Sequence, residues 1–275
     1  MNQTILRIIG SREWELPFIR MSVAEADGLV DKIVITEHDH THTGDPHQFE
    51  LESYFETSCV LPSGSELSYH AVRMDPSSVR THKTKGNLHW NEMLMRGSFE
   101  QFISVYDDDI VICVDADEVI YRRSFPKLIA KVSRSRRRDP LAIPMHQFFY
   151  RMNYLWTDIK FASATIGRAS ALREMETPWR DAHRRMRGKH GCHFSWNLTV
   201  DQMIAKLQTY SHHLDYGHLA RREVLEEAVQ AKAYPFREEK PFTIRELGWG
   251  ELDQYLPASW RHEQGRLAHL LPSQS

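Results

Sequence analysis

The chain has 275 residues, of which 41% are hydrophobic and 26% are charged, and its formal net charge is −2. This composition is that of a globular protein with a sizeable core, and it excludes disordered, collagenous and disulfide-rich classes. The balanced charge argues against a protein devoted to non-specific nucleic-acid binding, which would be clearly basic.

The predicted elements alternate between amphipathic helices and buried strands. A helix over residues 13–25 is followed by a strand over 30–37 and a loop over 38–45, at the strand edge where ligands bind in α/β sheets. A helix over 89–105 precedes the apolar run 110–114, which is typical of a central parallel strand. Further predictions are helices over 124–132, 200–210 and 221–233 and strands over 141–150, 165–171 and 193–198. No internal repeat or low-complexity linker interrupts the chain, so we predict one domain.

The sequence indicates neither a targeting segment nor a membrane span. The apolar stretch at the start is broken by Arg7 and is too weak for a signal peptide. No apolar run approaches the roughly 20 residues of a membrane helix. The three cysteines include no Cys-x-x-Cys pair, which favours a reducing compartment. We therefore predict a cytoplasmic protein.

The strongest chemical signal is the acidic run that ends the apolar strand, Val114-Asp115-Ala116-Asp117-Glu118. Because side chains alternate along an extended chain, Asp115 and Asp117 are expected to point to the same side. Two carboxylates at the mouth of a sheet can hold Mg²⁺ or Mn²⁺, and the ion can carry substrate phosphates in its open positions. The alternative is an acidic loop that caps the next helix.

An Asp-x-Asp pair after an apolar strand fits two classes of enzyme. One class is the nucleotide-sugar glycosyltransferases of the GT-A type. The other is the haloacid dehalogenase-like phosphohydrolases, in which Asp115 would be the nucleophile. Those phosphohydrolases carry the motif near the start of the chain and a later Gly-Asp-x-x-x-Asp pair, which this sequence lacks.

A basic stretch and several of the sixteen histidines add candidate site residues. The stretch contains Arg180, Arg184, Arg185, Arg187 and Lys189. It could neutralise a diphosphate leaving group, or form a solvated face. It could also serve a non-enzymatic carbohydrate- or nucleic-acid-binding module. His193 and His212 are candidates for a metal ligand or an acid–base group.

Five blocks of residues then occur in order along most of the chain. They are Glu15, Leu16, Ile19 and Arg20; Val30, Asp31, Val34, Ile35, Glu37, Thr41, His42 and Gly44; Trp90, Glu92 and Arg96; Asp108, Asp109, Asp115, Asp117 and Glu118; and His193, Phe194, Ser195, Lys206, Leu207, Ser211 and His212. Together these blocks resemble glycosyltransferase family 17. Cys192 departs from the family pattern, which tends to have Trp there.

The resemblance implies a GT-A-like α/β fold, Rossmann-like, with a mostly parallel sheet flanked by helices. The catalytic domain would span residues 1–235, and a C-terminal segment, 236–275, would pack on it. The implied reaction is a metal-dependent, inverting transfer of a hexosyl or N-acetylhexosaminyl group from a nucleoside-diphosphate sugar to an acceptor hydroxyl. A UDP-sugar is the favoured donor, a glycan is one possible acceptor, and the ion would be Mn²⁺ or Mg²⁺.

The resemblance and the chemistry of the parts give each residue an expected role. Asp117 would bind the metal, Asp115 would bind the metal or the donor ribose, and His212 would be the third metal ligand. The residues expected to bind the donor are Glu37, Thr41, His42, Arg96, Asp115, Arg187 and Lys189. Inversion needs a general base, for which Asp201, His193 and Glu118 remain alternatives.

Overall fold

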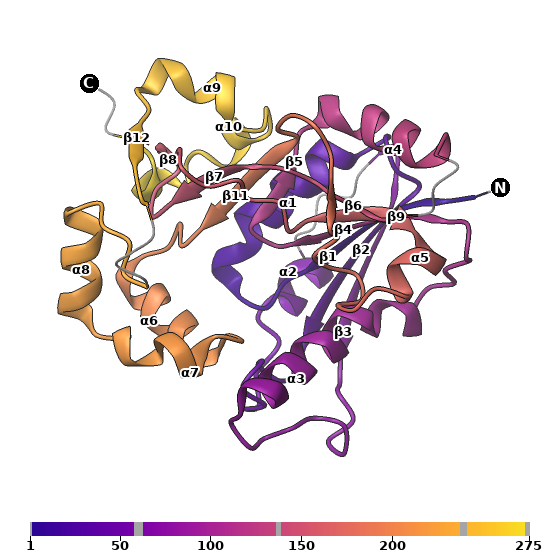
Figure 1. The fold of residues 1–275 in the computed structure, drawn as a ribbon, viewed down its shortest axis with the longest axis horizontal. Helices are drawn as coiled ribbons and strands as arrows, with labels where there is room; N and C mark the ends of the chain where they lie inside the picture. Colours follow the sequence, from indigo (N-terminus) through magenta and orange to yellow (C-terminus); the bar gives the residue numbers. More distant parts are fainter. Residues whose placement is uncertain (1, 58–62, 136–138, 237–240, 273–275) are drawn as a thin grey trace.

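A computed structural model of the protein describes residues 2–57, 63–135, 139–236 and 241–272, and it is built on a seven-stranded sheet (Figure 1). The strand order is β10-β6-β9-β4-β1-β2-β3. Four neighbouring strands are parallel: β1(Thr4–Ile9), β2(Lys32–His38), β3(Glu66–Val72) and β4(Ile110–Asp115). Beyond β4 the sheet becomes mixed, with β9(Thr165–Arg168), β6(Leu141–Ala142) and β10(Arg184–Arg185).

Helices cover both faces of this sheet because its central strands are apolar on both sides. Leu6 and Ile8 of β1 belong to the same buried cluster as residues of α1(Leu16–Ala26) and α4(Phe125–Ser133). Ile5 of β1, on the opposite face, packs with Phe99 and with α5(Ala169–Arg173). Parallel strands buried on both faces are typical of α/β proteins. The predicted α/β architecture, with a mostly parallel sheet flanked by helices, is therefore confirmed.

A second, five-stranded sheet extends the fold. Its order is β12-β8-β7-β11-β5, with bounds β12(Ile244–Glu246), β8(Tyr154–Trp156), β7(His146–Phe149), β11(Gly191–Ser195) and β5(Glu118–Ile120). The C-terminal residues, drawn in yellow in Figure 1, lie beside it. Fully buried Trp260 shares an apolar cluster there with Phe18 of α1 and Phe194 of β11.

The two sheets meet at the acidic run. β4 ends at Asp115 and β5 begins at Glu118, so a two-residue turn carries the chain from one sheet to the other. β5 pairs antiparallel with β11, and Glu118 is opposite His193 in that register. The fold thus brings the end of the central parallel strand next to β11, which lies more than 70 residues later in the chain.

The remaining elements complete the helical layers. Their bounds are α2(Glu52–Thr57), α3(Lys85–Gly97), α6(Val200–Thr209), α7(His213–Tyr216), α8(Arg222–Gln230), α9(Leu252–Tyr255) and α10(Trp260–Glu263). In the ranges that the structure describes, we find no helix long and apolar enough to cross a membrane.

Several predicted elements differ from the observed ones for identifiable reasons. The predicted helix 13–25 begins with a 3₁₀ turn, η1(Glu13–Glu15), and the α-helix begins at Leu16, with Pro17 in its first turn where a missing N–H costs nothing. The predicted strand 141–150 divides into β6 and β7, which belong to different sheets and flank Pro144. Proline cannot donate to a ladder, so the strand cannot continue through it. β1 was not predicted, because Arg7 breaks its apolar pattern.

The close approach of β11 to β5 requires glycine at position 191. A Cβ atom there would lie 2.4 Å from the Val119 carbonyl oxygen. We expect Gly191→Ala to force the two strands apart and to lower the free energy of unfolding by about 1–3 kcal/mol. Urea unfolding followed by circular dichroism measures the change.

Gly86→Ala is the matched control. It lies in α3, where a Cβ atom would meet nothing within 4 Å. We expect it to leave stability unchanged or to raise it by up to about 1 kcal/mol. Equal stability of Gly191→Ala and the wild type would contradict the predicted clash.

Candidate active site

A cavity of about 360 Å³ opens at the C-terminal edge of the parallel strands. Its walls come from the segments after β1, β2 and β4, from α3, and from β11, α6 and the loop that follows α6. The lining residues include Gly10, Ser11, Arg12, Trp14, Glu15, Thr41, His42, Glu92, Arg96, Asp115, Asp117, Phe161, Arg180, His193, Trp196, Lys206, Tyr210 and His212. Open α/β sheets bind their ligands at this edge.

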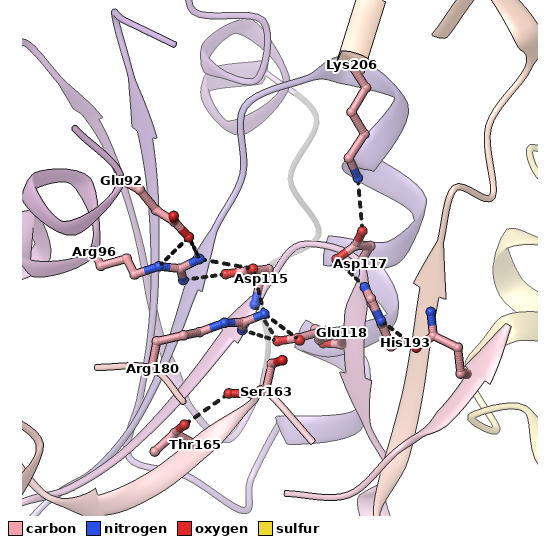
Figure 2. Close-up of polar contacts among 12 residues, drawn as sticks. Glu92, Arg96, Asp115, Asp117, Glu118, Ser163, Thr165, Arg180, His193 and Lys206 are labelled. Carbon is pink, nitrogen blue, oxygen red and sulfur yellow. Dashed lines mark hydrogen bonds and ion pairs between the residues drawn. The ribbon is translucent and has the colours of Figure 1, made fainter. Parts of the chain in front are cut away.

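Two arginines hold the carboxylate of Asp115 (Figure 2). Arg96 Nη1 lies 2.8 Å from Oδ1, and Arg180 Nη2 lies 3.0 Å from Oδ2. Burial alone would raise the pKa of Asp115, but Arg180 and Arg96 hold it well below its usual range. Arg96 also binds Glu92, at 2.7 Å. Partial burial opposes the charge on this carboxyl, but Arg96 and His42 lower its pKa to about 2.

Glu118 fixes the second arginine in place. The two guanidinium nitrogens of Arg180 lie 2.7 and 2.9 Å from its two carboxylate oxygens, and Glu118 is fully buried. The same carboxylate accepts a hydrogen bond from the Asp115 backbone N–H. Arg180 lies between Trp179 and Asp181, which both have positive φ, so the chain stores backbone strain where it presents this side chain.

Asp117 faces the opposite wall of the cavity (Figure 2). Lys206 Nζ reaches down from α6 to within 3.2 Å of Oδ2, and His193 Nε2 lies 3.5 Å from Oδ1. Burial opposes the charge on Asp117, but Lys206 and His193 hold its pKa below the usual range. His193 Nδ1 is 2.7 Å from Gln147 Oε1, and the ring stacks on Phe161, so its orientation is fixed.

The protein alone does not assemble the predicted metal ligands Asp115, Asp117 and His212. The arginines occupy both oxygens of Asp115, and the His212 side chain is 64% exposed, with Nδ1 3.8 Å from Asp215. No group of three His, Cys, Asp or Glu side chains in the described residues is arranged to hold a metal. Asp117 is held less closely, with Lys206 at 3.2 Å and His193 at 3.5 Å, so the residues present fit an ion that takes this one carboxylate and completes its shell with substrate oxygens, as Mg²⁺ commonly does.

The loop after β2 was predicted to face the nucleotide, and it does border the cavity. Thr41 and His42 are among the lining residues, and burial lowers the pKa of His42 below its usual range. Gly44, with φ +81°, turns this loop against the Arg80 carbonyl, where a Cβ atom would lie at 2.4 Å. Glu37, in contrast, is fully buried away from the cavity and accepts hydrogen bonds from the backbone N–H groups of residues 50 and 51.

Other predicted site residues lie elsewhere. Asp201 is 75% exposed and forms an ion pair with Arg222, outside the lining of the cavity. Lys189 donates to the Met145 carbonyl, and Arg187 is exposed; neither lines the cavity. Of the basic stretch 180–189, Arg180 is the member that reaches the cavity. The structure therefore places these three residues outside the cavity, and Arg187 and Lys189 lie after β10, beyond the point where Arg180 enters it.

Several lining residues had no individual role among the predictions from the sequence. Lys206 and Glu15 lay in the family-17 blocks, which was the available signal for them. Glu15 Oε2 accepts hydrogen bonds from the backbone N–H groups of Ser11 and Arg12, and burial raises its pKa to about 7. Trp196 has a φ of +57°, and its ring lies 5.5 Å below the Lys206 ammonium.

A family model matches most of the chain. The model of glycosyltransferase family 17 matches residues 2–232. The chain therefore belongs to glycosyltransferase family 17, and the protein is a glycosyltransferase. A search of curated proteins gave no match.

Two solved structures are distantly similar to the chain. One is 4-diphosphocytidyl-2C-methyl-D-erythritol synthase, with a TM-score of 0.41 and 10% identity over 75% of this chain and 98% of that one. The other is the glycosyltransferase GlyE of Streptococcus pneumoniae TIGR4, with a TM-score of 0.37 and 10% identity over 100% of this chain and 66% of that one.

Family membership and geometry together remove the two alternative functions. Asp115 is not placed as the nucleophile of a phosphohydrolase, because Arg96 and Arg180 hold both of its oxygens. A binding module based on the basic stretch is not supported either. Arg180 is buried, and Arg184 is paired with Asp139.

Replacement of Arg180 tests the ion network. In Arg180→Met, the fully buried Glu118 carboxylate loses its cation, so we expect a loss of about 3–5 kcal/mol in the free energy of unfolding. Adding Glu118→Gln to that variant removes the unpaired charge and is expected to recover part of the loss. Chemical denaturation of the three proteins measures both effects.

Arg184→Met is the control, because Arg184 is exposed and its ion pair with Asp139 is also exposed. It is expected to change stability by less than about 1 kcal/mol. An equally small effect of Arg180→Met would contradict the role assigned to the network.

Proposed function

We propose that the protein transfers a sugar from a nucleoside-diphosphate sugar, with a UDP-sugar favoured, to an acceptor hydroxyl with inversion at the anomeric carbon. The observation that carries this proposal is the set of three cations, Arg96, Arg180 and Lys206, in the cavity at the C-terminal edge of the parallel strands. Each is paired with a carboxylate of the acidic run. An anionic diphosphate is the ligand that such a site accommodates best.

The ends of the cavity differ, which supports one orientation of the donor. The loop with Thr41 and His42 lies at the edge formed by β2, where a nucleoside would fit beside α3. Trp14, Trp196 and Tyr210 line the cavity on the side of the second sheet and α6. Aromatic faces suit the apolar faces of sugar rings, so we place the transferred sugar and the acceptor at this end.

We further propose that a divalent cation, Mn²⁺ or Mg²⁺, accompanies the donor. Asp117 would hold it, with His193 beside this carboxylate and with diphosphate oxygens completing the shell. When bound, such an ion neutralises negative charge on the leaving diphosphate. Arg96 and Arg180 would neutralise the same negative charge from the protein side, and Asp115 keeps both guanidinium groups oriented.

The reaction then follows from the placement of these groups. The acceptor oxygen forms a bond to the anomeric carbon while the bond from that carbon to the diphosphate oxygen breaks. The electron pair leaves with the nucleoside diphosphate, whose charge the arginines and Lys206 stabilise. The acceptor hydroxyl loses its proton, which requires a base at the sugar end of the cavity.

A donor screen tests the proposal directly. UDP-glucose, UDP-galactose, UDP-N-acetylglucosamine and their GDP counterparts are each added with Mn²⁺ or with EDTA. We expect at least one donor to raise the melting temperature, because a ligand that binds the folded state stabilises it, and to be hydrolysed slowly to the nucleoside diphosphate. The absence of both effects with every donor would contradict the function.

The metal assignment has its own test. Asp117→Asn should abolish the gain in UDP affinity that Mn²⁺ gives the wild type, and should lower turnover at least 100-fold, without unfolding the protein. Titration calorimetry with UDP, with and without Mn²⁺, measures the first effect. Asp108→Asn, an exposed carboxylate at the other end of β4, should behave as the wild type. An unaltered response to Mn²⁺ in Asp117→Asn would refute this ligand.

A further inference from the structure

Among the residues that the structure describes, four carboxylates line the cavity, and three of them already hold cations. Asp115 binds Arg96 and Arg180, Asp117 lies against Lys206, and Glu92 binds Arg96. A carboxylate held by a cation is a weak base, because the partner stabilises its charged form. The fourth is Glu15, which forms no ion pair within 4 Å in the part of the chain that the structure describes.

The hydrogen bonds of Glu15 are divided unequally between its two oxygens. Oε2 accepts from the Ser11 backbone N–H at 2.8 Å, from the Arg12 backbone N–H at 3.2 Å and from the Ser11 hydroxyl at 3.5 Å. These bonds fix the carboxylate on η1, directly before α1. Across the described residues, Oε1 has no hydrogen-bond partner, so one lone-pair-bearing oxygen remains for a ligand in the cavity.

We propose that Glu15 is the catalytic base that deprotonates the acceptor hydroxyl. This inference rests on the proposed glycosyl transfer and adds the residue that the reaction lacks. Glu15 comes from the segment after β1 and lines the cavity with Lys206 of α6 and Asp117 as its charged neighbours, so it lies on the α6 side that is assigned to the sugar and the acceptor. In the reaction, the acceptor proton moves to Oε1 as the acceptor oxygen bonds to the anomeric carbon, and Glu15 later releases the proton to water.

The bases considered from the sequence are less well placed. Both ring nitrogens of His193 face protein oxygens, Gln147 Oε1 at 2.7 Å and Asp117 Oδ1 at 3.5 Å. Glu118 is bound through both oxygens to Arg180 and does not line the cavity. Asp201 is exposed and paired with Arg222. Each therefore lacks a free acceptor atom in the cavity.

The charges around Glu15 suit a base that works near neutral pH. Burial raises its pKa to about 7, with Lys206 of α6 lowering it and Asp117 of the turn after β4 raising it. Of the other charged groups of its own segment, Arg12 pairs with Glu50 and Glu13 is exposed, and His47 contacts the Ser11 carbonyl. A carboxyl with this pKa is half ionised near pH 7, so its function as a base is expected to be lost as the pH falls through 7.

The test compares Glu15→Gln with the wild type, using the donor that the screen identifies and water as the acceptor. The amide oxygen can still accept the Ser11 and Arg12 N–H groups, so the turn is retained while the base is removed. We expect the rate of UDP release at saturating donor to fall at least 100-fold, while the affinity for UDP changes less than twofold. We also expect the melting temperature at pH 8 to be equal or higher, because a buried charge is lost.

Glu13→Gln is the matched control, since Glu13 is an exposed carboxylate in the same turn and does not line this cavity. It should release UDP at the wild-type rate. If Glu15→Gln does not fold, Glu15→Asp replaces it; the shorter carboxylate should slow UDP release at least tenfold and keep the fall in rate below pH 7.

The outcomes separate this inference from the proposed function. A rate within threefold of the wild type in Glu15→Gln, or in Glu15→Asp if that variant replaces it, would overturn the assignment. So would a tenfold weaker affinity for UDP with an unchanged rate, which would make Glu15 a contact of the nucleotide. A wild-type protein that releases UDP from no donor would instead contradict the proposed function, and the assignment of Glu15 with it.

Discussion

The paired contact between Arg180 and Glu118 holds the two sheets together at the point where the cavity begins. Glu118 opens β5 in the second sheet, and Arg180 comes from the segment before β10 at the edge of the first. The same guanidinium reaches Asp115 at the end of β4. Because an unpaired buried charge is costly, the ion pairs of Arg180 with Glu118 and Asp115 must form together. Glu118 also accepts a hydrogen bond from the Asp115 backbone N–H, which fixes the turn between β4 and β5. Asp117 lies in this turn and contacts Lys206 and His193.

This network also bears on how the acidic motif would face the proposed anionic donor. Arg96, Arg180 and Lys206 compensate the carboxylates before any ligand arrives, so the proposed diphosphate would meet a site whose cations are already oriented. Arg7 of β1 adds a further positive charge near Asp115. It is fully buried near Asp115 and Cys113, and its guanidinium lies over the Phe99 ring. Preorganised charge of this kind stabilises a leaving group without a large rearrangement.

The long, regular elements were predictable from the sequence. The apolar run that became β4 and the strand that became β2 were found because central parallel strands are apolar on both faces, and α6 was found from its helical spacing. β1 was missed because its buried Arg7 looks like an interruption in a linear pattern. The division of 141–150 between two sheets follows from Pro144, but the sheet that each half joins depends on partners far away in the chain.

The sequence by itself determined the family, the α/β class and two segments that line the cavity, the acidic run and the loop after β2. Those signals are local: strand periodicity, adjacent carboxylates and ordered motif blocks. The tertiary structure decided which charged groups are paired. Arg180 meets Glu118 across 62 positions, and Lys206 meets Asp117 across 89. Whether a carboxylate oxygen remains free to accept a proton depends on such distant contacts. Glu118 and Asp201 were therefore equivalent candidates for the base in the sequence. Glu15 became a candidate only through the cavity around it.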